Sequence, residues 1–222
     1  MKGKGERGFC WNVSPKDKKK YPPLEELFKK MWRDYDKYIN LEEGDLPFWH
    51  SEWTLVGTMA VAASQFGPVM LEYCEKNPKT KKTKRPDAWF RFSEKDEELD
   101  MLLEAKRDEL SIRTDADKLY DYTYDYLKTG SNYLKQFKDS SWTAAVFFLQ
   151  IYACQRDVTN PNQYQKLLNS LLKNCKQAYE NISNKAARPF WAYYFLRHDQ
   201  LIEEDKYSAP GVVIFGYLRK VG

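Results

Sequence analysis

Residues 141–154 constrain the fold more than any other part of the chain. This run is apolar almost without alternation and rich in Val, Phe and Ala, which is typical of a strand covered on both faces of a sheet. Helices must therefore lie on both sides of it, and this arrangement indicates an α/β protein. The chain has 222 residues, of which 42% are apolar, and this is enough for one domain with a substantial core.

Helices and further strands are predicted on either side of this run. Apolar residues recur at helical spacing after Pro22-Pro23 and after Asn160-Pro161, and a helix rich in small residues spans 51–66 before the stop signal Gly67-Pro68. Thr114 and Asp117 resemble a capping box that starts another helix, which Gly130-Ser131 ends or kinks. Strands are predicted over 69–75, 87–92, 101–106, 190–196 and 212–218.

This order predicts an α/β sandwich with a mixed central sheet flanked by helices. We expect a single domain over residues 21–222, with its core at about 51–182. Residues 1–20 are rich in Gly and Lys and lack periodicity, so we expect a flexible basic tail with Phe9 and Trp11 packed against the body.

The two alternating segments around a short charged turn carry the main chemical signal. In residues 87–92 polar and apolar side chains alternate, which places Asp87 off the core face. In residues 101–106 the alternation places Glu104 and Lys106 on one face, because side chains two positions apart point the same way. Residues 93–98 are polar and suit the turn of a hairpin. Antiparallel pairing then brings Asp87 close to Glu104 and Lys106.

Two carboxylates with a neighbouring carbonyl suit Mg²⁺, which prefers oxygen ligands and usually takes one or two protein carboxylates. The Ala105 carbonyl is suitably placed beside Glu104. An ion held in this way lowers the pKa of a bound water and neutralises charge on a phosphate, while a nearby ammonium orients either group. We therefore expect phosphodiester hydrolysis with Asp87, Glu104 and Ala105 as ligands of Mg²⁺, for which Mn²⁺ can substitute.

Pro86-Asp87 followed by Glu104-Ala105-Lys106 resembles the motif of the PD-(D/E)xK nuclease superfamily, which includes many restriction enzymes and junction resolvases. The resemblance covers the core of the chain, with Asp87 and Glu104 separated by 17 positions. It implies a restriction-endonuclease-like fold, an endonuclease acting on DNA, and a Lys106 that positions or activates water. The alternative is an ordinary surface hairpin with an acid and a lysine on its polar side.

The resemblance also implies a further glutamate on the helix before the first strand. Glu52 has that position, although the helix dipole alone explains an acid in a first turn. Glu72, on the predicted strand 69–75, is the competing candidate. The helix after Thr114 often lends a polar residue in this superfamily. Lys118 and Tyr122 are the candidates here, because its first turns contain no Gln.

Basic charge gathers in two places. Residues 1–20 carry seven basic and two acidic side chains, so the rest of this chain of net charge +4 is close to neutral. Residues 76–85 carry six basic and no acidic side chains and lead directly to Asp87. We expect this second block to contact the phosphates of nucleic acid, the alternative being a solvated loop. The predicted contacts are Lys79, Lys81, Lys82, Lys84 and Arg85.

The sequence does not contain the motifs of other common metal or catalytic sites. The four cysteines have no paired spacing and the two histidines lie far apart, which indicates neither a zinc site nor a disulfide framework but reduced thiols in a cytoplasmic protein. No apolar run suits a membrane span, and no phosphate-binding loop or nucleophile elbow is present. Two alternative functions stay open: an inactive nuclease fold that binds nucleic acid or protein, and an RNA-directed nuclease. The protein could also form a homodimer.

Overall fold

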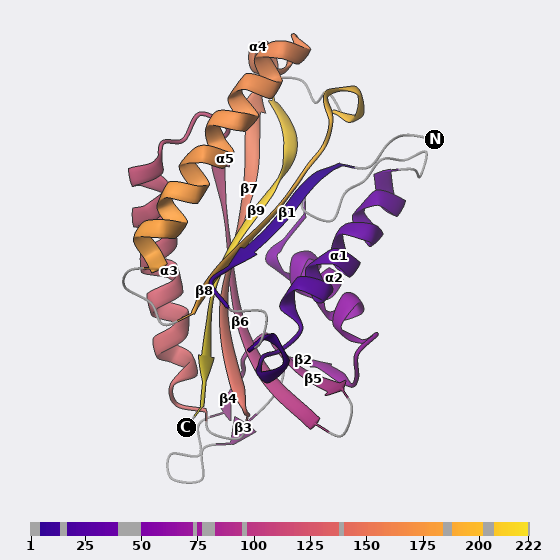
Figure 1. Cartoon of the computed structure of the whole chain (residues 1–222), viewed down its shortest axis with the longest axis vertical. Helices are drawn as coiled ribbons and strands as arrows, with labels where there is room; N and C mark the ends of the chain where they lie inside the picture. The colour runs from indigo at the N-terminus through magenta and orange to yellow at the C-terminus, as the bar shows by residue number, and fades with distance from the viewer. Residues whose placement is uncertain are drawn as a thin grey trace.

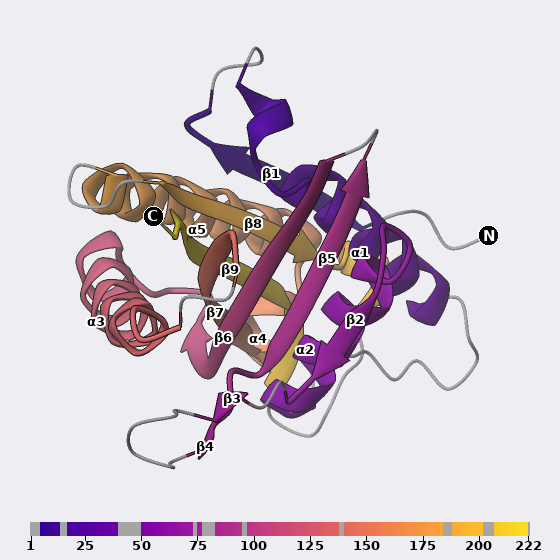
Figure 2. The same cartoon turned by 90° about the horizontal axis from the view of Figure 1, so that it is seen from below.

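The computed structural model of the chain describes residues 5–13, 17–39, 50–72, 75–76, 83–94, 97–137, 140–183, 188–201 and 207–221. Within these residues a seven-stranded mixed sheet has the order β1-β8-β9-β7-β6-β5-β2. Its strands are β1 (Glu6–Trp11), β2 (Val69–Leu71), β5 (Ala88–Glu94), β6 (Glu97–Ser111), β7 (Trp142–Cys154), β8 (Pro189–Phe195) and β9 (Tyr207–Lys220). A separate two-stranded ribbon consists of β3 (Glu75–Lys76) and β4 (Thr83–Lys84), and it projects from the body (Figure 2).

Helices cover both faces of the sheet, as the α/β prediction required (Figure 1). One face packs against α1 (Leu24–Ile39) and α2 (Glu52–Ala63). The other packs against α3 (Ala116–Leu134), the short α4 (Gln155–Val158) and α5 (Pro161–Ser183). Two 3₁₀ turns, η1 (Lys18–Lys20) and η3 (His198–Gln200), complete the described elements. None of the helices in the described part of the chain is both long and apolar enough to cross a membrane.

The central position of β7 confirms the interpretation of the apolar run. The strand lies fourth in the sheet, between β6 and β9, and its side chains are buried on both faces from Trp142 to Gln150. Phe148 packs toward α1 and α2, whereas Phe147 packs toward α3 and α5. Burial on both faces explains why this segment does not alternate.

The predicted hairpin is present as β5 and β6. Ala88 pairs with Leu103 in antiparallel register, which places Asp87 opposite Glu104. Ala88 and Phe90 are fully buried, whereas Asp87 is half-buried on the opposite face, as the alternation predicted. However, β6 continues to Ser111 and pairs in parallel with β7 from Met101 to Ser111. Because β5 begins only opposite Leu103, the second half of β6 has a free edge on that side.

The N-terminal segment differs from the prediction, because part of the expected flexible tail is an edge strand. Residues Glu6–Trp11 form β1 and pair antiparallel with β8, with Arg7 opposite Tyr194. The expected contacts of Phe9 and Trp11 with the core are confirmed, and Phe9 stacks on Phe28 at 5.5 Å. Nonlocal pairing with β8 therefore orders a segment that has no periodicity of its own.

Several boundaries also differ from the predictions. The expected turn over 93–98 is shorter, because β5 and β6 continue through it and Ser93 pairs with Glu98. Helix α2 ends at Ala63, before the expected stop. Strand β2 ends at Leu71, and Glu72 lies outside it with φ at 50°, so the predicted strand over 69–75 was too long and Glu72 is not a strand residue. Helix α3 is capped by Asp115, whose side chain accepts the Lys118 N–H at 2.8 Å, rather than by the Thr114 box.

Candidate active site

The free edge of β6 positions Asp87 and Glu104 together. Along this edge no described strand lies next to the amide of Ala105, because β5 pairs with β6 only up to Leu103. The Asp87 carboxylate accepts this Ala105 N–H at 2.6 Å. The first residue before β5 thus supplies a side-chain acceptor where the ladder ends, and Asp87 is fixed opposite Glu104.

Glu52 lies next to the same edge, two residues further along β6. It is the first residue of α2, and the nearby backbone N–H of Arg107 favours the charged form of its carboxylate. The next amide in this series, that of Glu109, donates to the Asp108 side chain at 2.8 Å. The side chains of Asp87 and Asp108 therefore accept backbone donors of β6 on the side that β5 does not reach. The position of Glu52 at the start of α2 brings a helix residue to a site built mainly on strands.

Lys106 lies between the acids. Its Nζ is 3.2 Å from Glu104 Oε1 and 3.7 Å from Glu52 Oε1, and it donates a hydrogen bond to the Ala105 carbonyl at 2.7 Å. The lysine side chain is 43% exposed, whereas the Glu104 side chain is only 13% exposed. The ammonium therefore faces the opening of the site, with Glu104 beneath it.

The cluster carries an excess of acidic groups. Burial, reinforced by the charge of Asp87 and opposed by Lys106, raises the pKa of Glu104 to about 7. Burial likewise raises the pKa of Asp87, against the Ala105 N–H bond, and raises the pKa of Glu52, against the attraction of Lys106. Burial lowers the pKa of Lys106, but the three acids outweigh it and the net change is upward. One lysine thus compensates three carboxyl groups only in part.

Tyr133 of α3 joins the cluster to the end of the basic block. Its hydroxyl accepts the backbone N–H of Arg85 at 3.1 Å. Burial raises the pKa of this tyrosine, and the charges of Glu104 and Asp87 add to the effect. Arg85 itself is exposed. The chain that leads to Asp87 is therefore attached to α3 beside the acids.

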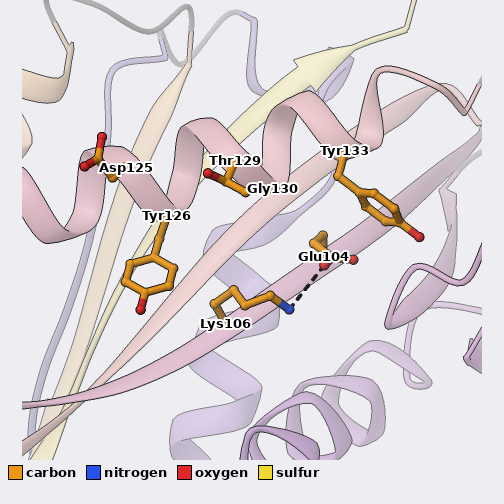
Figure 3. A pocket seen from close by; sticks show the side chains of 7 residues that line it. All are labelled: Glu104, Lys106, Asp125, Tyr126, Thr129, Gly130 and Tyr133. Atoms are coloured by element: carbon orange, nitrogen blue, oxygen red, sulfur yellow. Dashed lines mark ion pairs between the residues drawn. The ribbon is translucent and has the colours of Figure 1, made fainter.

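A pocket of about 340 Å³ opens next to Glu104 and Lys106 (Figure 3). The opposite wall comes from α3, where Tyr126 and Tyr133 point toward the two β6 residues from either side of Gly130. The helix approaches closely at Gly130, because a Cβ there would lie 3.2 Å from the Ala145 Cβ. Asp125 and Thr129 complete the lining.

The donor set suits a hard divalent cation. Asp87 and Glu104 are neighbouring carboxylates with an excess of negative charge, and the Ala105 carbonyl points to the same strand edge as the amide that Asp87 binds. No group of three or more His, Cys, Asp or Glu side chains within the described ranges is arranged to hold a metal. Two carboxylates and a carbonyl could still hold Mg²⁺, which keeps several waters and usually takes one or two protein carboxylates.

The structure brings four predicted residues together, Glu52, Asp87, Glu104 and Lys106. Glu72 is exposed, yet its charge raises the pKa of Asp87, so it lies at the margin of the site.

The predicted helper residues lie elsewhere. Neither Lys118 nor Tyr122 lines the pocket; Tyr126 and Tyr133, which lie further along α3, do so instead. The 3.6-residue period of α3 places Tyr126 and Tyr133 seven positions apart on one face, and this spacing was the available signal. Of the predicted basic contacts, Lys79, Lys81 and Lys82 and the side chain of Lys84 lie outside the described residues.

Comparison with known proteins identifies no family for the chain. No protein-family profile, no characterised protein and no solved structure matches the chain.

Proposed function

We propose that the chain is a Mg²⁺-dependent endonuclease with a restriction-endonuclease-like fold, acting on DNA. The observation that carries the proposal is the meeting of Asp87, Glu104 and Lys106 at the free edge of β6, with Glu52 beside them. Two carboxylates, a carbonyl and an ammonium are the parts that phosphodiester hydrolysis needs.

In this proposal Asp87, Glu104 and the Ala105 carbonyl hold Mg²⁺, or Mn²⁺ in its place. The bound ion would lower the pKa of a water and neutralise charge on the phosphate. The Ala105 N–H fixes the Asp87 carboxylate by a hydrogen bond of 2.6 Å. Lys106 orients the water or a phosphate oxygen through its N–H donors. Glu52, 3.7 Å from the lysine Nζ, orients that ammonium.

The structural contacts of the acids support a second candidate function. Because Asp87 also accepts a strand amide and Glu52 pairs with Lys106, their presence has a structural explanation that needs no catalysis. A nuclease fold that only binds nucleic acid or protein would keep the same bonds. The discriminating variant must therefore preserve the cap and remove the charge.

Asp87→Asn meets this requirement, because its amide oxygen can still accept the Ala105 N–H. Lys106→Met removes the ammonium and keeps the length of the side chain. A bound metal stabilises the transition state by several kcal/mol, and each ~1.36 kcal/mol changes the rate tenfold. We therefore expect both variants to cleave at least about a thousandfold more slowly.

The assay measures cleavage of supercoiled, linear, branched and single-stranded DNA and of RNA, with Mg²⁺ or Mn²⁺ and with EDTA. Glu180→Gln, at an exposed position of α5, is the matched control and should cleave at the wild-type rate. Cleavage by Asp87→Asn at the wild-type rate would refute the proposed site. Binding without any cleavage by the wild type would favour the binding fold, and cleavage of RNA alone would favour an RNA-directed enzyme.

A further inference from the structure

We infer that the pocket between α3 and β6 holds one unpaired nucleobase of the substrate strand, next to the phosphate that is cut. The inference rests on the proposed function and adds a substrate class to it, namely single-stranded, frayed or branched DNA. A base inside an intact duplex is stacked and paired, so it cannot enter a side pocket unless it is first extruded.

The walls of the pocket are aromatic and held in place. Tyr126 stacks on Phe147 with ring centroids 4.4 Å apart and an interplanar angle of 21°. Tyr133 packs edge-on against Phe137 at 5.4 Å, and its hydroxyl is tied to the Arg85 N–H. Rings supported in this way are ready to stack on a planar ligand, because little side-chain freedom is lost on binding.

The space between the rings suits a planar group. Tyr126 and Tyr133 are seven residues apart on one helix, so their Cα atoms are separated by roughly 10 Å along the axis. Gly130 lies between them and contributes no side chain to fill the space (Figure 3). The volume of about 340 Å³ lies at the lower end of ligand pockets, which run from roughly 300 Å³ upward. This is room for one base rather than for a longer ligand.

The position of the pocket favours a base that belongs to the substrate. Glu104 and Lys106 form its β6 wall, so a base held there lies beside the groups proposed to act on the phosphate. The hydroxyl of Thr129, which lines the pocket, can bond the polar edge of a base. Arg85 enters the same region through Tyr133 and can follow the backbone of the bound strand.

The test measures binding in EDTA, where no metal-dependent cleavage occurs. The probe is a single-stranded oligonucleotide with 2-aminopurine, a base whose fluorescence falls when it stacks, and a matched duplex is the comparison. Wild type should bind the single strand and quench the probe. Tyr126→Leu, which keeps apolar contact with Phe147, and Thr129→Trp, which fills the pocket, should each weaken single-strand binding roughly tenfold and abolish the quenching.

Tyr122→Ala provides the matched control. Tyr122 lies on the same helix with 39% exposure, close to the 37% of Tyr126, but it does not line the pocket. We expect this variant to bind and quench like the wild type, and all variants to bind duplex equally.

The outcomes separate this inference from the proposed function. Quenching that depends on Tyr126, without cleavage in Mg²⁺, would keep the base pocket and refute the nuclease. Metal-dependent cleavage with single-strand binding unaffected by Tyr126→Leu and Thr129→Trp would keep the nuclease and refute the pocket. Absence of binding to any oligonucleotide, together with absence of cleavage in Mg²⁺, would refute both.

Discussion

Replacement of Glu104 by Gln should stabilise the folded protein at alkaline pH. Burial and the neighbouring Asp87 raise the pKa of Glu104 from its ordinary 4.5 to about 7, a net change that already includes the attraction of Lys106. The folded chain therefore binds this proton more tightly than the unfolded chain. Stability from this group is present at low pH and is lost as the pH rises through about 7.

The expected magnitude follows from that change in pKa. Each pKa unit corresponds to about 1.36 kcal/mol, so the ionised carboxyl lowers the free energy of unfolding by about 3 kcal/mol above pH 7. For a chain of this size, 1 kcal/mol changes Tm by roughly 2 to 4 °C. Glu104→Gln should thus unfold roughly 6 to 12 °C above the wild type near pH 8, and close to it near pH 5.

The assay is thermal unfolding, followed by circular dichroism at both pH values in EDTA and then in Mg²⁺. Mg²⁺ should raise the Tm of the wild type near pH 8 and leave that of Glu104→Gln almost unchanged, because binding to the folded state stabilises it. Glu180→Gln, at an exposed position, should show no pH-dependent difference from the wild type. A Glu104→Gln variant less stable than the wild type near pH 8 would refute the reasoning and identify Glu104 as a stabilising ion-pair partner of Lys106.

Two further predictions concern regions outside the cluster. Replacement by Gln of the four lysines Lys79, Lys81, Lys82 and Lys84 should weaken binding to all duplex sequences alike. It should also reduce the slope of log affinity against log salt concentration by roughly 0.9 per lost phosphate contact. An unchanged slope would identify a solvated loop. The Arg113 guanidinium holds the pKa of the buried Asp157 below its usual range. Asp157→Asn should therefore lower the free energy of unfolding, measured in urea titrations, by roughly 1 to 3 kcal/mol at neutral pH. This difference should shrink as the pH falls through the lowered pKa, and a difference that stays constant with pH would contradict the assignment.

Much of the fold could be predicted because its signals are local. The period-2 alternation around Asp87 and Glu104 specified the hairpin and its faces, and the apolar run specified β7. Strand β1 could not be predicted in the same way, because its partner β8 lies near the other end of the chain. The length of β2 depended on pairing with β5, not on the composition of residues 69–75.

The residues of the site also divide into those that local spacing predicts and those that depend on pairing between distant segments. Asp87, Glu104 and Lys106 come from one hairpin, so their spacing alone brought them together. Tyr126 and Tyr133 face the site because β6 extends beyond β5 and packs beneath the middle of α3, and this depends on the parallel pairing of β6 with β7. The prediction looked for a helper in the first turns of that helix, where Lys118 and Tyr122 lie, and was therefore displaced by about one to four turns.

The excess length of β6 explains both the fold of the site and its proposed chemistry. A strand that extends past its neighbour leaves backbone amides to be satisfied by other groups, and Asp87 supplies an acceptor for the amide of Ala105. This bond fixes the Asp87 carboxylate before any substrate arrives, which is the preorganisation that the proposed electrostatic catalysis requires. The structural role of Asp87 and its proposed catalytic role are therefore compatible, and stability alone does not distinguish them. A change of charge does, because Asp87→Asn retains the cap while it removes the proposed metal ligand.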